Sequence, residues 1–344
     1  RHSSKITCAG TPSGWRQVPE DAMKAIRIDD DTLVWRDAPA PALGPGEVRI
    51  AVRATAINRA DLVQRSGNYP PPPGASDILG LECAGEVVEV GEGVTRVEPG
   101  DLVCALLAGG GYAEQVVVPA GQVLKVPAGF DAVRAAAIPE VFATAYLNLF
   151  MEAALARGER VLLHAGASGV GTAGVQLCRA LGNPCLVTAG GQDKIERCVA
   201  LGADGGADRH AGGFEDTVKA WTDGAGVDVI LDPVGASYLE QNVRCLATGG
   251  RLVLIGLMGG ATAEINLGML LVKRLRLIGS TLRARPVSEK AAVMDALHRR
   301  VWPLFESGEV EPVIERVMPI TEADAAHALV ASNDTVGKVV LTIG

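Results

Sequence analysis

Residues 164–171 form a glycine-rich segment, His-Ala-Gly-Ala-Ser-Gly-Val-Gly, between a short apolar run at 161–163 and a helical pattern that ends at Gly182. Glycine allows a tight turn and a close approach of the backbone, and the N-terminus of the following helix offers free N–H groups to a pyrophosphate. The segment is an imperfect GxGxxG. Its place at the first strand–helix junction of a repeating β/α region predicts a dinucleotide-binding turn, with a glycine turn needed only for packing as the alternative.

From about residue 145 onward, the chain alternates apolar strands with helices. A helix with an apolar face at Ile195, Cys198 and Val199 ends at Gly202. Such alternation predicts a mostly parallel sheet that is covered by helices on both faces. The C-terminal part returns to a mixed pattern, with a helix expected at 289–306. The predicted strands lie at 161–163, 186–188, 227–231, 250–255, 275–280, 313–317 and 338–343.

The first part of the chain, from Met23 to about Lys125, has a different pattern. Val48, Ile50 and Val52 alternate with charged residues, and short alternating runs at 85–91 and 115–119 are bounded by Gly and Pro. Short strands of this kind predict a barrel-like all-β unit. The sequence therefore predicts an α/β protein with two units. Residues 1–22 are polar and irregular, and we interpret them as an extension outside the fold or a cloning remnant.

The composition excludes several classes of function. The 344 residues carry a net charge of −8 without a basic tract, which argues against binding to nucleic acid. The longest uncharged stretch, 161–178, contains four glycines and several polar residues, so it is a poor lipid-facing helix. We expect neither a membrane span nor a signal peptide. Seven cysteines without a CxxC pair predict reduced thiols and a cytoplasmic protein.

The second strand of the β/α region bears on the identity of the dinucleotide. NAD-specific sites usually place an acidic residue about 20 residues after the glycine turn, where it bonds the ribose hydroxyl. Here no carboxylate ends the strand, whereas Lys194 lies just beyond it and Arg209 ends the following strand. These cations would attract a 2′-phosphate, so we predict NADPH. Asp193 is the evidence against it, and a solvated lysine at a helix start is the alternative for Lys194.

Several further motifs agree in order along the chain. They are Asn58-Arg59-Ala60-Asp61-Leu62, Tyr69 before four prolines, Pro73-Gly74-Ala75-Ser76 and Gly256-Leu257-Met258-Gly259-Gly260. With the stretch from Gly158 to Arg179, they make the chain resemble the zinc-free quinone oxidoreductases of the medium-chain dehydrogenase/reductase superfamily. Ser168 stands where many members have glycine, which is similar to the zeta-crystallin-like, tumour-suppressor-inducible branch of that family.

The resemblance implies a GroES-like β-barrel catalytic domain at 23–142 and 286–344, and a Rossmann NADPH-binding domain with a doubly wound parallel sheet at 143–285. The active site would lie in the cleft between them. In the family pattern the glycine turn contacts the cofactor phosphates, and the second group of residues surrounds the adenosine phosphate. Leu257 and Met258 approach the nicotinamide end, and Leu282 and Arg283 lie near the substrate pocket. The implied cofactor-binding residues are Ser168, Gly169 and Val170, then Gly191, Lys194 and Arg209, then Leu257, Met258, Leu282 and Arg283.

The same resemblance bears on metal binding. Zinc alcohol dehydrogenases of the superfamily hold a catalytic zinc with an early Cys and a Gly-His-Glu segment. Here those places read Asn58 and Gly80-Leu81-Glu82, and only Cys83 and Cys104 fall where a four-cysteine structural lobe would be. We therefore expect no metal.

Without zinc, the substrate must accept hydride without a Lewis acid on its oxygen, as a quinone or a conjugated enone does. The resemblance places Asn58 and Tyr69 at the substrate, where their amide and hydroxyl would donate to the acceptor oxygen. The alternative for Tyr69 is a packing residue beside the prolines. We interpret His164, Asp61 and Glu82 as structural residues.

The leading hypothesis is thus an NADPH-dependent quinone oxidoreductase with direct, zinc-independent hydride transfer. The alternatives are an NADPH-dependent enone or enoyl reductase of the same fold and a non-catalytic NADPH-binding protein. The resemblance implies a homodimer. The apolar strand at 275–280 is expected at a sheet edge, where it would pair with a second copy.

Overall fold

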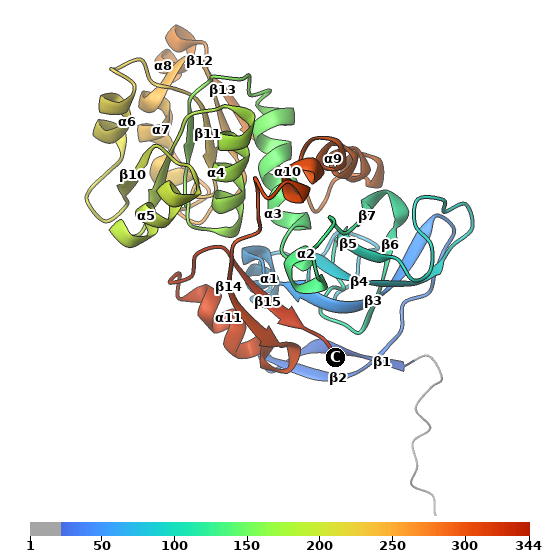
Figure 1. The fold of residues 1–344 in the computed structure, drawn as a ribbon. Helices are drawn as coiled ribbons and strands as arrows, with labels where there is room; N and C mark the ends of the chain where they lie inside the picture. The colour runs from blue at the N-terminus through green and yellow to red at the C-terminus, as the bar shows by residue number, and fades with distance from the viewer. Residues whose placement is uncertain (1–21) are drawn as a thin grey trace, which may run out of the picture.

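The computed structural model describes residues 22–344 (Figure 1). It contains two large sheets, one mainly antiparallel and one parallel, and so confirms the predicted α/β fold. Ala22 pairs with Pro39 as the first residue of strand β1, whereas the rest of the proposed extension lies outside the described residues. Within 22–344, no helix combines the length and the apolar character that a membrane span requires.

The first unit is built on a seven-stranded sheet in the order β14-β15-β3-β4-β5-β7, with β6 also paired to β3. The alternation at Val48, Ile50 and Val52 places these side chains in the core, each at most 3% exposed. Strands β1 and β2 form a separate hairpin. The bounds are β1 Ala22–Asp29, β2 Thr32–Pro39, β3 Glu47–Ala56, β4 Glu82–Val90, β5 Leu102–Leu106, β6 Gln115–Pro119, β7 Val123–Lys125, β14 Ile314–Pro319 and β15 Lys338–Thr342.

The second unit is a six-stranded parallel sheet in the order β10-β9-β8-β11-β12-β13. This is the strand order 3-2-1-4-5-6 of a dinucleotide-binding fold, whose switch point lies between β8 and β11. The predicted edge position of 275–280 is confirmed by β13. The bounds are β8 Val161–Leu163, β9 Cys185–Ala189, β10 Gly205–Asp208, β11 Val227–Asp232, β12 Leu246–Leu254 and β13 Arg276–Gly279.

Helices cover both faces of the parallel sheet, because neighbouring residues of each strand point to opposite sides. In β8, Val161 and Leu163 pack in one core with residues of α4 and α5, whereas Leu162 packs in another with residues of α6 and α7. This double layer explains the nearly continuous apolar character of the strands. The helices of this unit are α4 Gly169–Leu181, α5 Gln192–Leu201, α6 Glu215–Trp221, α7 Leu239–Cys245 and α8 Leu267–Lys273.

The helix predicted at 289–306 is two helices, α9 Val287–Arg300 and α10 Trp302–Glu306. The break comes at Val301 because Pro303, in the first turn of α10, has no N–H to continue the hydrogen bonds of α9. The remaining helices are α1 Arg59–Arg65, α2 Ala132–Ala136, α3 Pro139–Tyr146, which continues into a π-helical turn at Leu147–Glu152, and α11 Ala323–Ala331.

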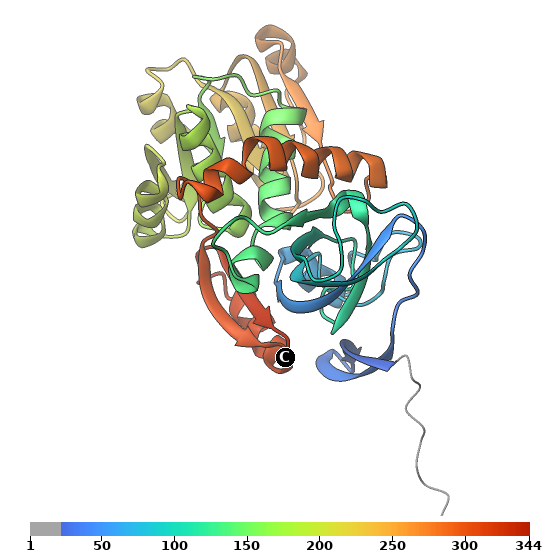
Figure 2. The same cartoon turned by 45° about the vertical axis from the view of Figure 1, so that its right-hand side comes forward.

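The C-terminal part of the chain returns to the first unit and ties the two units together. Helix α9 crosses the region between them (Figure 2), and one hydrophobic core combines Ala84 of β4, Ala173 of α4 and Leu297 of α9. At the start of β15, Gly337 N donates to the Ala167 carbonyl at 2.9 Å, directly beside the glycine-rich turn. The end of the chain therefore brings residues of the first unit against the proposed nucleotide turn.

Candidate active site

The glycine-rich turn joins β8 to α4 at the switch point of the parallel sheet. Ser168 is the N-cap of α4, and its hydroxyl accepts a hydrogen bond from Gly171 N at 3.0 Å. A Cβ on Gly171 would lie 2.4 Å from the Ala165 carbonyl oxygen, so only glycine permits this path. The first turn of the helix leaves the N–H groups of Gly169 and Val170 without intrahelical acceptors. This geometry fits the phosphates of a dinucleotide.

A buried hydrogen-bond chain holds the strand ends beneath this turn. Asn242 Nδ2 donates to Asp232 Oδ2 at 2.9 Å, which turns Asn242 Oδ1 toward His164 Nε2 at 2.7 Å. His164 Nε2 is therefore the protonated nitrogen, and Nδ1 accepts from the Thr188 hydroxyl at 3.0 Å. Burial lowers the pKa of His164 to about 4, so the ring is neutral. The interpretation of His164 as a hydrogen-bonded core residue is confirmed.

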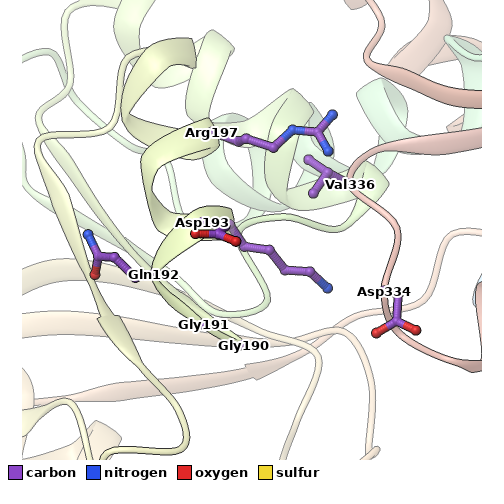
Figure 3. A pocket seen from close by; sticks show the side chains of 8 residues that line it. Gly190, Gly191, Gln192, Asp193, Arg197, Asp334 and Val336 are labelled. Atoms are coloured by element: carbon purple, nitrogen blue, oxygen red, sulfur yellow. The ribbon is translucent and has the colours of Figure 1, made fainter.

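A cavity of about 310 Å³ lies between the start of α5 and the segment that precedes β15 (Figure 3). Gly191, with φ +100°, and Lys194 line it, as expected for residues around an adenosine phosphate. Lys194 Nζ donates to the Asn333 carbonyl, and burial lowers its pKa. A second cation, Arg197, also lines this cavity. Sequence reasoning did not single out this residue.

Arg209, the other predicted cation, lies outside this cavity, and two acidic residues line it together with the two cations. Arg209 is not one of its lining residues, and its Nε lies 3.4 Å from His210 Nε2. Asp193 and Asp334 line the cavity beside the two cations. Arg197 is paired with Glu315 at 2.9 Å. Lys194 is therefore the predicted cation that the fold brings to the cavity wall.

The residues predicted for the nicotinamide end, Leu257 and Met258, and those predicted near the substrate pocket, Leu282 and Arg283, lie in different surroundings. Leu257 and Met258 follow β12 and are 56% and 55% exposed. Leu282 is buried, and so is Arg283. The Arg283 guanidinium donates to Gln64 Oε1 at 2.8 Å and to the carbonyls of Ala108 and Tyr69. Arg283 is thus directed toward the first unit and away from the nucleotide turn.

Tyr69 is half-buried, and its ring lies under the Arg283 guanidinium, with 5.2 Å between the guanidinium carbon and the ring centroid. Burial raises the pKa of the Tyr69 hydroxyl, while the charge of Arg283 acts in the opposite direction. The cation and the ring hold each other in place, with the hydroxyl protonated at neutral pH.

Asn58 lies between β3 and α1, in a position that its neighbours determine fully. Lys338 Nζ donates to Asn58 Oδ1 at 2.6 Å, which identifies the oxygen, and Asn58 Nδ2 donates to Glu82 Oε1 at 2.9 Å and to the Ala56 carbonyl at 3.3 Å. Both amide hydrogens are therefore engaged within the protein. This arrangement leaves Asn58 no free hydrogen for an acceptor oxygen, contrary to the role that the sequence suggested.

Lys338 and Glu82 form an ion pair in the interior. Nζ and Oε1 are 2.8 Å apart, and the two side chains are 4% and 0% exposed. Lys338 also donates to the Ile57 carbonyl at 2.7 Å, so its three N–H groups all have acceptors. The aliphatic part of Lys338 passes the glycine turn, because a Cβ on Gly169 would lie 2.7 Å from Lys338 Cδ. This pair links the first unit to the nucleotide turn.

These residues do not fit a zinc ion. Glu82 is neutralised by Lys338, and Asn58 turns its NH₂ group toward the carboxylate where a thiolate ligand would be needed. Burial raises the pKa of the Cys83 and Cys104 thiols, which disfavours thiolates. In the part of the chain that the structure describes, no group of three or more His, Cys, Asp and Glu side chains is arranged to hold a metal.

Two further carboxyl groups complete this cluster, and sequence reasoning missed their arrangement. Asp61 accepts from Asn58 N at 2.8 Å and from Gly80 N at 3.0 Å, and burial raises its pKa to about 6. Glu140 N donates to Glu82 Oε2 at 2.9 Å, and burial raises the pKa of the Glu140 carboxyl to about 8. Asp61 and Glu82, which the sequence suggested were merely structural and unpaired, thus share a site with Glu140.

One sequence signal points to this cluster. Lys338 interrupts an apolar stretch, and Glu140 follows Pro139 in another. Charged residues in buried stretches are rarely found without partners. The sequence alone, however, does not show that the two stretches meet.

Comparisons with known proteins place these observations in a family context. The family model described as "Alcohol dehydrogenase GroES-like domain" matches residues 44–128, and the model described as "Zinc-binding dehydrogenase" matches residues 169–299. The chain is 31% identical over 301 residues to a protein of Nematostella vectensis named "Quinone oxidoreductase-like protein 2 homolog", with 87% of this chain and 82% of that protein covered.

Two solved structures are similar over nearly the whole chain. A structure titled "Crystal Structure of NAD-dependent alcohol dehydrogenase" has a TM-score of 0.80 and 29% identity, and covers 94% of this chain and 100% of its own. A structure titled "Crystal structure of CurK enoyl reductase" has a TM-score of 0.81 and 27% identity, and covers 94% and 100%.

Proposed function

The chain belongs to the medium-chain dehydrogenase/reductase superfamily of oxidoreductases, and from this premise we propose that it uses NADPH to reduce a conjugated carbonyl compound, with a quinone as the leading acceptor. The observation that carries the proposal is the buried Lys338–Glu82–Asn58 arrangement. It places the Lys338 ammonium and the Asn58 amide where a zinc enzyme of the family needs metal ligands. Reduction must then proceed without a Lewis acid on the acceptor oxygen.

The residues that would hold the dinucleotide come from three places. The first turn of α4 would bind the pyrophosphate through the N–H groups of Gly169 and Val170. Lys194 would meet a 2′-phosphate at the cavity beside Gly191, since it is the predicted cation that lines that cavity. The reduced nicotinamide would supply hydride. Residues 257 and 258, at the carboxyl edge of β12, would lie at that end of the cofactor.

A conjugated acceptor suits this site because the charge that develops on its oxygen is delocalised. A hydrogen-bond donor near that oxygen still accelerates the reaction. The Tyr69 hydroxyl is available for this role, because no protein group accepts from it or donates to it within the described residues. We propose that Tyr69 orients the acceptor, with Arg283 holding the ring. A Tyr69→Phe enzyme that kept the full rate would remove Tyr69 from this role.

An enone or enoyl acceptor is the second candidate. The similarity to the structure titled as an enoyl reductase favours it, as that title names the chemistry of that protein. Such a reductase needs a proton donor as well as hydride, and a buried carboxyl group lies in this cluster.

The deciding experiment is NADPH oxidation by purified protein, with and without 1,2-naphthoquinone or the enone trans-3-octen-2-one, repeated with NADH and with chelator-treated protein. We expect acceptor-dependent turnover that prefers NADPH and is unaffected by the chelator. A preference for NADH would contradict the role of Lys194. Tight NADPH binding without turnover of either acceptor would instead support a binding protein.

We also propose that the chain forms a homodimer through the outer edge of the parallel sheet. Strand β13 has one free edge, and the adjacent helix α8 exposes Leu267 by 67%, and Leu271 and Val272 by 78% each. An uncovered edge with apolar residues favours pairing with a second copy. Light scattering should give twice the chain mass, and a Leu271→Glu variant should give the mass of one chain. A wild-type monomer at micromolar concentration would contradict the proposal.

A cytoplasmic location is proposed on the state of the thiols. The six cysteines within residues 22–344 are all free and buried, as expected in a reducing compartment.

A further inference from the structure

Glu140 differs from the other carboxyl groups of the cluster in having an oxygen without a partner. Its Oε2 is enclosed by protein and makes no hydrogen bond, whereas Glu82 and Asp61 each accept from at least two donors. An enclosed ionised oxygen without a hydrogen bond is strongly unfavourable, so the neutral acid is favoured here. The residue as a whole is partly exposed, although this oxygen is enclosed.

The charge balance of the cluster also favours the neutral, protonated form of Glu140. Lys338 is the cation of the cluster, and all its N–H groups are used by Glu82, Asn58 and Ile57. Glu140 is therefore the third carboxyl group beside an ammonium that is already paired. Like charges at short range oppose a second and third ionisation.

The other charged groups that act on Glu140 come from several elements. Arg283, in the loop after β13, lowers the pKa of Glu140 and so partly offsets Glu82 and Asp61, which raise it. The Arg283 guanidinium itself donates to Gln64 and to backbone carbonyls. An ionised Glu140 would also raise the pKa of Lys290 of α9. The Lys290 ammonium donates to the Arg283 carbonyl at 3.3 Å. Neither cation forms a hydrogen bond with the Glu140 carboxylate.

Glu140 also lies at the substrate end of the site. An ionised Glu140 would raise the pKa values of Tyr69 and Arg283 on one side. On the other side, the Glu140 backbone N donates to Glu82 Oε2, and Glu82 Oε1 accepts from Asn58. The start of α3 thus places an acid in the neighbourhood of the two residues that the sequence assigned to the substrate pocket. Asn58 itself cannot donate, since its amide hydrogens are engaged.

We propose that Glu140 is the proton donor of the reaction, held as a neutral acid until the acceptor oxygen gains negative charge. This inference rests on the proposed function. Hydride brings two electrons to the conjugated acceptor, and the excess charge collects on its carbonyl oxygen. The O–H bond of Glu140 then breaks, and a new O–H bond forms on the acceptor, giving the enol or the hydroquinone. The Glu140 carboxylate regains its proton from water.

The test compares wild type with Glu140→Gln, which keeps the shape of the side chain and removes the acid. General acid catalysis contributes about 10²- to 10⁴-fold, so kcat should fall by at least about 10²-fold with either 1,2-naphthoquinone or trans-3-octen-2-one. The wild-type rate should decline as the pH rises through about 8, because only the protonated acid donates. The variant should have lost that dependence, and NADPH should bind to it as to wild type. Glu140→Asp, which retains an acid, should recover part of the rate.

Controls separate the inference from the proposed function. Glu311→Gln alters a glutamate that is 58% exposed and paired with Arg134, and it should leave rate and pH profile unchanged. A protonated-carboxyl band in the infrared spectrum at pH 7 should disappear in Glu140→Gln. Absence of that band in wild type, or a variant with wild-type rate and profile, overturns the inference alone. A wild type inactive with both acceptors overturns the proposed function and the inference together.

Discussion

Replacement of Lys338 by Met should destabilise the protein far more than loss of an exposed lysine. The Lys338 ammonium lies 2.8 Å from Glu82 Oε1 in a site where the two side chains are 4% and 0% exposed. Coulomb's law at that distance, with an effective dielectric constant of about 20, gives an attraction of about 6 kcal/mol. Part of this offsets desolvation, and removal of one partner of a buried pair typically costs about 3–5 kcal/mol, because the other charge stays buried.

The assay is the free energy of unfolding from urea titration at pH 7. Lys125→Met is a matched control, because Lys125 Nζ is also 2.8 Å from its partner, Asp101, but the lysine side chain is 55% exposed. An exposed pair contributes little because solvent screens it, so the control should lose far less stability than Lys338→Met.

A double-mutant cycle identifies the cause. In Lys338→Met with Glu82→Gln, the uncompensated charge is gone, so the double variant should be more stable than Lys338→Met alone. Equal losses for Lys338→Met and Lys125→Met would refute the reasoning. So would a double variant whose loss is the sum of the two single losses, since independent sites add.

Three further predictions concern the cap of α4, the cavity at Lys194, and two buried histidines, His164 of the nucleotide unit and His327 of α11 in the first unit. Ser168→Ala removes the N-cap of α4 and should cost about 1 kcal/mol of unfolding free energy, measured by urea titration, whereas Ser168→Asp should retain the cap. Lys194→Met should weaken binding of NADPH, measured by calorimetry, while NADH binding stays as in wild type; an equal loss for both would contradict the 2′-phosphate role. Burial lowers the pKa of His164 and of His327 to about 4, so each histidine stabilises the fold above about pH 6.5, and that contribution is lost as the pH falls through 4. Unfolding free energies from pH 7 to 4 should show this decline, and a His164→Asn variant should show a shallower one.

The sequence determined the parallel unit to a large extent, because its signals are local. Apolar runs of strand length and the glycines of 164–171 predicted strands that the structure confirms at β8, β9, β11 and β13. Lys194 followed from the same local reasoning, as it lies a few residues beyond a predicted strand. Outside this unit, the local pattern did not reveal the break at Val301, where Pro303 divides α9 from α10.

The proposed catalytic cluster was decided by the tertiary structure. Asp61, Glu82, Glu140 and Lys338 come from α1, β4, α3 and β15, and no local pattern shows that these four segments meet. The protonation of a buried carboxyl depends on which charges surround it and on whether water can reach it. Those neighbours are assembled only when the C-terminal strand β15 returns beside β3 and passes the glycine turn. A sequence can therefore predict the nucleotide turn from its own residues, while the state of Glu140 depends on segments far away along the chain.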